Sequence, residues 1–266
     1  MDSKQLGGRN LGDRLTFLGH STVLVDLDGV RVLTDPVLGH LAGGALRRQV
    51  PVVEPGTLVD LSAVFVSHGH WDHLDAASIR ALPGQPVLIV PVGLGRIAAK
   101  VAPGAVHELR AGDRLQVGAI TLEAVHAEHG RRRSLFTAAE GALGILMIGS
   151  SSVYFAGDTD LFPQMAQLAG RVDVALLPID GWGPRLGRGH LDPSRAAEAT
   201  ARIRPSIATP IHWGTLFPLG LRRIAGGRLE RPAEAFRAAV AARAPGVEVR
   251  VLRPGESMAL SGTPGR

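Results

Sequence analysis

The sequence predicts an α/β fold, and three observations carry that prediction. A β-rich opening with an Asp28-Gly29 turn indicates a hairpin, because these two residues adopt the positive φ angles that tight hairpin turns require. The nearly all-apolar run Leu61–Ser67 is typical of a strand buried on both faces. Short apolar runs then alternate with helical patterns. Because no linker interrupts the chain, we expect one domain over residues 1–266, with flexible ends at 1–12 and 261–266.

The individual elements follow in chain order. The opening is expected to form a meander of three strands, at Arg14–Leu18, Thr22–Asp26 and Val30–Thr34. The stretch Pro36–Gly56 is punctuated by Gly and Pro and has no clear periodicity, and a loop of this length is usually functional. After Leu61–Ser67, strands are expected at Val87–Val90, Val117–Val125, Ser152–Ala156, Val174–Leu177, Ser206–Thr209 and Val247–Leu252. Helices are expected at His73–Leu82, Ser194–Arg202 and Ala233–Ala242, the second of them capped by Asp192.

Composition limits the classes of function. The absence of cysteine excludes disulfides and thiolate metal ligands. No apolar run is long enough to span a bilayer, and the polar N-terminus lacks the apolar core of a secretory signal, so we expect no transmembrane segment and a cytoplasmic location. The net charge of +5 comes almost entirely from arginines scattered along the chain, which argues against a dedicated nucleic-acid surface.

A cluster of metal-binding residue types directly follows the apolar strand. His68 and His70 alternate in the backbone, which places two imidazoles on the same side, within reach of one cation. Asp72 and His73 stand where the chain turns into the next helix and point to a second position. This mixed nitrogen and oxygen set suits Zn, Fe or Mn. Four candidate ligands at this spacing predict a metal site rather than a histidine-rich turn.

Further candidate ligands follow later predicted strands. They are His129, Asp158 and His212. Gly157, just before Asp158, would let the backbone bend close to a metal. Each of the three taken alone has an ordinary structural explanation, but their shared position at strand ends favours a common site. We therefore predict that the site holds two metal ions.

Several segments resemble the metallo-β-lactamase superfamily. The run VSHGHWDHLD, Val66–Asp75, is similar to the metal-binding signature of that superfamily. Other segments resemble the branch that contains ascorbate-6-phosphate lactonase and N-acyl-phosphatidylethanolamine phospholipase D. They are LGHST at Leu18–Thr22, LTDP at Leu33–Pro36, FAGDT at Phe155–Thr159 and PIHWGT at Pro210–Thr215. The resemblance covers nearly the whole chain.

The resemblance implies a four-layer αβ/βα sandwich, the metallo-β-lactamase fold, with the site at one edge of two facing sheets. It also implies a ligand assignment, in which His68, His70 and His129 hold one metal, Asp72, His73 and His212 hold the other, and Asp158 bridges them. Two metals in such a site share a water and lower its pKa, which gives a bridging hydroxide at neutral pH. Two divalent ions are expected, with zinc favoured over manganese and iron.

The sequence departs from the usual pattern of the superfamily at three places. Gly69 replaces a bulkier polar residue, which should leave the metal site intact. His126 competes with His129 as the third histidine ligand, and alignment with the superfamily favours His129. An unusual Arg131-Arg132-Arg133 run follows this position. Asp158 at the bridging position, in a chain without cysteine, argues against the cysteine-containing β-lactamase subclass and against antibiotic hydrolysis.

Other residues are candidates for catalysis or substrate binding. Asp72 and His190 are the candidate catalytic residues, and His190 would stabilise an oxyanion or protonate the leaving group. The alternative for His190 is a loop residue that supports the next helix. The candidate substrate-contacting residues are His20, Asp35, Arg132 and Arg185. Asp35 could instead orient a ligand histidine or occupy a turn, and each arginine could be a solvated surface residue.

Together these features predict a dinuclear metal-dependent hydrolase that uses a bridging hydroxide to cleave an ester-type bond. The favoured substrate is a small anionic molecule, either a phosphodiester or another phosphorylated compound. A lactonase acting on a sugar-like lactone is the alternative enzyme, and the ligands alone do not separate the two. A nucleic-acid-binding protein or nuclease is the alternative from a different class, although we expect no nucleic-acid partner. A homo-oligomer is compatible with the sequence.

Overall fold

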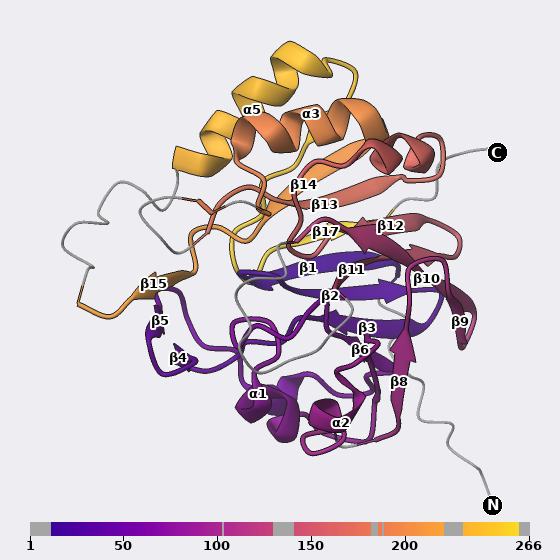
Figure 1. Cartoon of the computed structure of the whole chain (residues 1–266), viewed down its shortest axis with the longest axis vertical. Helices are drawn as coiled ribbons and strands as arrows, with labels where there is room; N and C mark the ends of the chain where they lie inside the picture. The colour runs from indigo at the N-terminus through magenta and orange to yellow at the C-terminus, as the bar shows by residue number, and fades with distance from the viewer. Residues whose placement is uncertain are drawn as a thin grey trace, which may run out of the picture.

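Two seven-stranded sheets organise the computed structural model, which describes residues 12–102, 104–129, 141–181, 186–187, 189–220 and 231–260 (Figure 1). The first sheet has the order β17-β1-β2-β3-β6-β7-β8. Its strands are β1 (Arg14–Gly19), β2 (Thr22–Leu27), β3 (Val30–Thr34), β6 (Ala63–Phe65), β7 (Val87–Pro91), β8 (Val106–Leu109) and β17 (Ser257–Ala259). The second sheet has the order β16-β14-β13-β12-β11-β10-β9. Its strands are β9 (Arg114–Val117), β10 (Ile120–Ala127), β11 (Ala142–Ile148), β12 (Ser152–Phe155), β13 (Val174–Pro178), β14 (Ile207–Ile211) and β16 (Glu248–Val249).

Helices cover the outer faces of the two sheets. The first sheet packs against α1 (Ala76–Ala81) and α2 (Gly95–Ala98), through a buried cluster that includes Leu33, Ile79 and Ala98. The second packs against α3 (Pro193–Ile203), α5 (Arg231–Arg243) and the 3-10 helix η3 (Pro163–Leu168). Figure 1 shows the helices above and below the paired sheets. This order of layers confirms the α/β fold class and the four-layer αβ/βα sandwich.

A third apolar cluster fills the space between the two sheets. It contains side chains of both sheets, among them Leu15 and Phe65 from one and Ile145 and Phe155 from the other. The rings of Phe65 and Phe155 meet edge to face, with centroids 6.1 Å apart. Burying side chains of this size contributes about 1.5–3 kcal/mol each. The packed core therefore holds the segments at the edges of the sheets in fixed positions.

Parallel pairing brings distant segments to the same edge. Strand β6 lies between β3 and β7, and all three run in the same direction. In the second sheet β12, β13 and β14 are also parallel. Parallel strands end at the same edge of a sheet, so the segments that follow β3, β6, β12 and β14 emerge near one another. These segments carry Asp35, the His68–His73 run, Asp158 and His212.

The expectation of an irregular loop over Pro36–Gly56 was wrong. This stretch contains β4 (Leu41–Ala42), β5 (Leu46–Arg48) and the 3-10 helix η1 (Pro55–Thr57). Strand β5 lies between β4 and β15 (Leu216–Pro218), which form a small three-stranded sheet beside the sandwich. Strands this short carry too little periodicity to be predicted. Their pairing depends on β15, which lies far away in the sequence.

Other boundaries also differ from the predictions. The predicted strand Val117–Val125 is divided between β9 and β10 by a turn at Gly118, whose φ is 53°. The helix predicted from His73 begins only at Ala76, because the carboxylate of Asp75 accepts the Ser78 backbone N–H (3.1 Å) and caps it. Strand β16 is shorter than predicted, and β8, β11, β17 and α2 were not predicted.

No helix within the described ranges is long and apolar enough to cross a membrane. The predicted flexible ends lie outside the described residues apart from Gly12, and so do Arg132 and Arg185.

Candidate metal centre

A tight turn after β6 brings the first candidate ligands together. The backbone N–H groups of His73 and Leu74 both donate to the carbonyl of His70, over 3.0 and 2.7 Å. This turn folds the His68–His73 segment back on itself, so that side chains close in sequence face one space. Gly157, with a φ of 61°, lies so close to the segment that a Cβ there would be 2.6 Å from the Cβ of Ser67. Only glycine leaves room for Asp158 to approach.

Three histidines form the first ligand group. The ligand atoms of His68, His70 and His129 all lie within 4.8 Å of one another. Nδ1 of His70 is 2.8 Å from Nε2 of His68 and 3.3 Å from Nε2 of His129. His126, the competing candidate, is elsewhere: its side chain is 50% exposed and faces Glu128. The geometry therefore places His129 in this group.

The second ligand group contains Asp72, His73 and His212, and it includes His20 as well. Oδ2 of Asp72 is 3.3 Å from Nε2 of His20, 3.7 Å from Nε2 of His73 and 3.9 Å from Nε2 of His212. His20 and His212 both adopt positive φ angles, and their imidazole centroids are 4.0 Å apart. Only 2% of His20 is exposed, so it is poorly placed to contact a substrate directly.

The carboxylate of Asp158 lies between the two groups. Its Oδ2 is 3.9 Å from Nε2 of His68 and 3.3 Å from Nε2 of His73. Its Oδ1 is 3.3 Å from Nε2 of His212. The carboxylate of Asp158 thus faces histidines of both groups, as a bridging ligand must.

Three buried polar atoms in this cluster make no hydrogen bond. They are Nε2 of His73, Nε2 of His212 and Oδ1 of Asp158. A buried polar atom without a partner costs about 1–3 kcal/mol, and charged groups cost more. Three such atoms that converge on one space fit metal coordination, because a cation supplies the missing partner for each of them. The donor set of imidazoles and carboxylates is also suited to zinc, manganese or iron.

Outer hydrogen bonds orient four of the imidazoles. Nδ1 of His73 donates to Oδ2 of Asp35 over 2.6 Å, and Nδ1 of His68 lies 3.0 Å from Ser67 Oγ, which itself donates to Asp35. Backbone carbonyls accept from the other two: Asp180 accepts from His212 and Gly189 from His129, both over 2.7 Å. With Nδ1 held in this way, Nε2 of each ring points to the cluster, which is the arrangement that metal-binding histidines need.

The structure therefore gives Asp35 a defined set of partners. Its side chain is completely buried and accepts hydrogen bonds from His73 and from both the backbone N–H and the Oγ of Ser67. This supports the alternative in which Asp35 orients a ligand rather than contacts a substrate. Ser67 was not predicted, although its position directly before His68 was a possible signal. The roles of the Asp180 and Gly189 carbonyls could not be predicted from the sequence, because every residue has a backbone carbonyl.

Burial and neighbouring charges set the protonation of the cluster. Burial lowers the pKa of His70 to about 4 and that of His20 to about 3, and it also lowers the pKa of His68 and His129. These imidazoles are neutral at pH 7. His73 is the opposite case: burial alone would lower its pKa, but the carboxylates of Asp158, Asp35 and Asp72 raise it well above 6.5.

Metal loading should therefore release a proton from His73. This imidazole is protonated at pH 7 in the metal-free protein, and a histidine must lose its proton to bind a metal. The affinity at this position should rise by about tenfold per pH unit until the pH reaches the raised pKa. Isothermal titration of Zn²⁺ in buffers of different ionisation enthalpy measures the release. The titration is done at about pH 6, because zinc-bound water, with a pKa of about 7, then keeps its protons. The release of one proton per bound metal is expected. If no proton is released, the charge state assigned to His73 is wrong.

His190 lies beside the cluster on a constrained loop. Its Nδ1 is 3.3 Å from the carbonyl oxygen of Gly187, and its Nε2 is 3.5 Å from Oδ2 of Asp158. The backbone N–H of Gly189 donates to Asp160, which also pairs with Arg195 on α3. Asp160 and Arg195 were not predicted to matter. The Asp192 side chain accepts the N–H of Arg195 over 2.8 Å, which is its predicted capping role.

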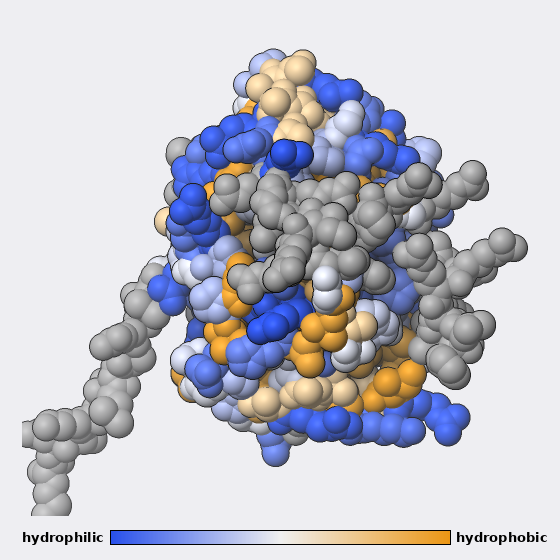
Figure 2. Space-filling view, turned by 90° about the vertical axis from the view of Figure 1, so that its left-hand side faces the viewer, coloured by the Kyte–Doolittle hydropathy of each residue, from blue (hydrophilic) through white to orange (hydrophobic). Residues whose placement is uncertain are grey.

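The small sheet packs beside the His68–His73 segment. Trp71 covers Gly43, where a Cβ would lie 1.8 Å from the indole ring. Leu41, Trp71 and Leu219 each expose more than a third of their surface. Figure 2 looks onto the side of the molecule where this sheet lies and shows hydrophobic residues interspersed with hydrophilic ones. The described surroundings of the centre are therefore mixed in polarity.

The fold and the converging imidazoles and carboxylates, with their unpartnered buried atoms, form a candidate metal centre, and relatives named as metal-dependent hydrolases place the chain in that class of enzyme. More specifically, residues 30–213 match the family described as the β-lactamase superfamily domain, and the chain belongs to this superfamily. The resemblance seen in the sequence motifs is thereby confirmed.

Relatives and solved structures agree with this assignment. The chain is 34% identical over 230 residues to N-acyl-phosphatidylethanolamine-hydrolyzing phospholipase D 1 of Caenorhabditis elegans. The aligned residues make up 77% of this chain and 64% of that protein. It is 35% identical over 256 residues to a metal-dependent hydrolase of Methanopyrus kandleri, and the alignment covers 92% of this chain and 98% of that protein. A metallo hydrolase from Ignicoccus hospitalis has the same fold, with a TM-score of 0.69, 23% identity and coverage of 92% and 97%. The chain thus spans less than two thirds of the worm protein.

Proposed function

We propose that this chain is a dinuclear hydrolase that cleaves a phosphodiester or another phosphorylated small molecule. The observation that carries the proposal is the position of Asp158, whose carboxylate faces histidines of two separate ligand groups. One cation would be held by His68, His70 and His129, and the other by Asp72, His73 and His212, with Asp158 shared between them. Two divalent ions bound there, zinc by preference, would supply Lewis acidity and would make a nearby water more acidic.

The chain's own residues would prepare the site for this chemistry. Asp35 holds the ring of His73, and through Ser67 it also holds that of His68, so the ligands are in place before substrate arrives. Asp72 would serve both as a ligand and as a hydrogen-bond acceptor for the nucleophile. His20 contacts Asp72 over 3.3 Å and would fix the orientation of that carboxylate.

His190 would protonate the leaving group. With Nδ1 directed at the carbonyl of Gly187, Nε2 is the nitrogen that faces the centre, next to Asp158. A proton held at Nε2 is stabilised by that carboxylate and can pass to the departing alkoxide oxygen. The side chain is 13% exposed, so a substrate can reach it.

Two further features favour an anionic phosphate substrate. The net charge of +5 attracts anions, and Arg132 and Arg185 remain candidate phosphate contacts, although they lie outside the described residues. The C. elegans relative is named for cleavage of a phospholipid, and this name supports a phosphate ester as the bond that is cleaved. Sugar-like lactones are the competing substrate class, because the same centre could attack a carbonyl.

A comparison of substrates tests the proposal. Protein purified without chelator is assayed for metal content, stripped, and reconstituted with zinc, manganese or iron before it is offered bis-nitrophenyl phosphate and a panel of lactones. Phosphodiester cleavage that depends on two metal equivalents is the expected result. Exclusive turnover of lactones would replace the proposed substrate class. Tight, salt-dependent association with DNA or RNA would instead indicate a nuclease.

Replacing His190 by glutamine should separate good from poor leaving groups. With an alkyl phosphodiester, whose leaving group needs a proton, kcat is expected to fall by about 10²-fold. With a nitrophenyl ester, whose leaving group departs as a stable anion, kcat should change little. The two substrates are compared at equal metal content, with the exposed His126→Gln as the matched control. Equal losses on both substrates would show that His190 does not donate the proton.

A further inference from the structure

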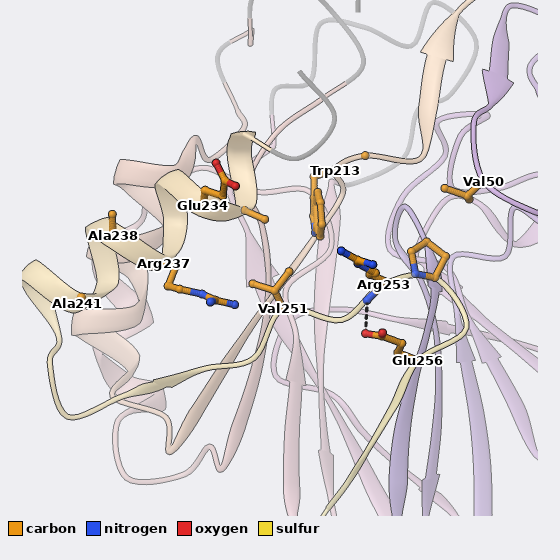
Figure 3. A pocket seen from close by; sticks show the side chains of 12 residues that line it. Val50, Trp213, Glu234, Arg237, Ala238, Ala241, Val251, Arg253 and Glu256 are labelled. Carbon is orange, nitrogen blue, oxygen red and sulfur yellow. Dashed lines mark hydrogen bonds between the residues drawn. The ribbon is translucent and has the colours of Figure 1, made fainter. Parts of the chain in front are cut away.

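A groove of about 880 Å³ lies between α5 and the segment 250–256, separate from the metal centre (Figure 3). Trp213 and Gly214 form its inner end, directly after the candidate ligand His212 in sequence. None of the candidate metal ligands lines it. The groove therefore has its own lining, contributed by Val50, by residues 213–214, by helix α5 and by the segment 251–256.

Two arginines reach into this groove from opposite walls. Arg237 extends from α5 toward Val251, and Arg253 extends from the facing segment toward Val251 and Trp213 (Figure 3). Within the described residues neither guanidinium has an ion-pair partner. Both side chains are exposed and lie on either side of Val251 (Figure 3). Two arginines without an acidic partner on the walls of one groove favour an anion as its ligand.

The acidic residues of the groove do not neutralise these arginines. The carboxylate of Glu256 accepts the backbone N–H of Arg253 over 2.8 Å and so caps a turn. Figure 3 shows the carboxylate of Glu234 turned away from the guanidinium of Arg237. Neither glutamate of the groove therefore pairs with the guanidinium of Arg237 or Arg253.

The remaining walls of the groove are apolar. Ala238 and Ala241 line it from α5, and Val251 and Trp213 line the floor and the inner end. The indole of Trp213 is fixed in place, because its N–H donates to the carbonyl of Pro210 over 3.0 Å and its ring is stacked with Phe17 at 6.5 Å. A rigid aromatic surface beside two cations suits a ligand with both an organic group and a charged group.

We infer that this groove is a second binding site, which holds a phosphate monoester through Arg237 and Arg253. A phosphate monoester carries about −1.5 to −2 charges at pH 7, which matches two guanidinium groups better than a single carboxylate does. Arginine forks also match the spacing of phosphate oxygens. The organic group of the ester lies against Trp213 and the alanines of α5. This inference stands on the groove alone and does not require the proposed phosphodiesterase activity.

Calorimetric titration of the metal-loaded protein with phenyl phosphate tests the inference. We expect a binding event that the double variant Arg237→Ala/Arg253→Ala weakens by at least about tenfold, the order expected when a charge-assisted hydrogen bond is lost. Arg243→Ala on the same helix lies outside the groove and should bind phenyl phosphate as the wild type does. Any binding at the metal centre would persist in both variants, so the two sites are distinguished.

A second pair of variants introduces charge instead of removing it. Ala238→Glu places a carboxylate in the groove, whereas Ala242→Glu places one on the same helix outside it. Loss of the phenyl phosphate event in Ala238→Glu alone supports the site. Identical isotherms for wild type, the double arginine variant and Ala238→Glu would overturn it. If inorganic phosphate binds as tightly as phenyl phosphate, the role assigned to the apolar wall is wrong.

Discussion

Replacing Asp158 by alanine is expected to lower kcat by about 10³-fold or more, the order of loss seen when a preorganised charged group is removed from an active site. The Asp158 carboxylate lies within 3.9 Å of His68, His73, His190 and His212. Without it, the two ligand groups lose a carboxylate that faces both, and the second metal equivalent should be lost. The sheets on either side do not depend on this side chain, so the fold should remain.

The measurement pairs turnover with metal content and circular dichroism. Glu128→Ala provides the control, because the carboxylate of Glu128 is exposed and faces the exposed ring of His126 rather than the ligand groups. Its activity and metal content should equal those of the wild type. Full turnover by Asp158→Ala, or two metal equivalents retained in that variant, would remove the shared-ligand role of Asp158 from the proposed mechanism.

Replacing Asp35 by alanine should reduce both stability and metal affinity. Breaking a buried charged pair by removal of one partner typically costs about 3–5 kcal/mol, and Asp35 is fully buried with three donors around its carboxylate. Its φ of 34° adds strain for alanine. Because His73 would lose the partner of its Nδ1, metal affinity should fall by about 10- to 100-fold.

Denaturant unfolding and competition with a chelator measure the two effects separately. Asp60→Ala is the matched control for the backbone, because Asp60 has a φ of 57° but lies exposed. Asp35→Asn keeps the shape of the side chain, so its stability and metal affinity should lie between those of Asp35→Ala and the wild type. If Asp35→Ala were no less stable than Asp60→Ala, the hydrogen bonds of Asp35 would contribute little to folding.

Much of the candidate centre was accessible to prediction from the sequence. His68, His70, Asp72 and His73 lie within six residues, so their proximity needs only a local turn. His129, Asp158 and His212 were predicted to join them because they follow strands, and the structure brings their ligand atoms into the same groups. Their roles as metal ligands stay a prediction that the metal-content experiments address.

Long-range contacts explain what the sequence did not reveal. The strands of the small sheet within residues 36–56 were missed because β5 pairs with β15, some 170 residues later, and neither carries a clear alternating pattern. His126 and His129 competed as candidates; alignment with the superfamily favoured His129, and the direction of each side chain agrees with that choice. The contact of His20 with Asp72 also depends on packing, because it joins the end of β1 to the turn after β6.

The sequence by itself determined the chemistry of this protein: an α/β chain without cysteine whose histidines and aspartates repeat the metal-binding signature of the β-lactamase superfamily. These features are local, since they depend on residue type and short spacing. Only the tertiary structure decided which histidines meet, that Asp35 holds two of them in orientation, and that Arg237 and Arg253 share a groove. These arrangements join residues that are not neighbours in the chain, and their geometry is fixed by the packing of the two sheets and their helices.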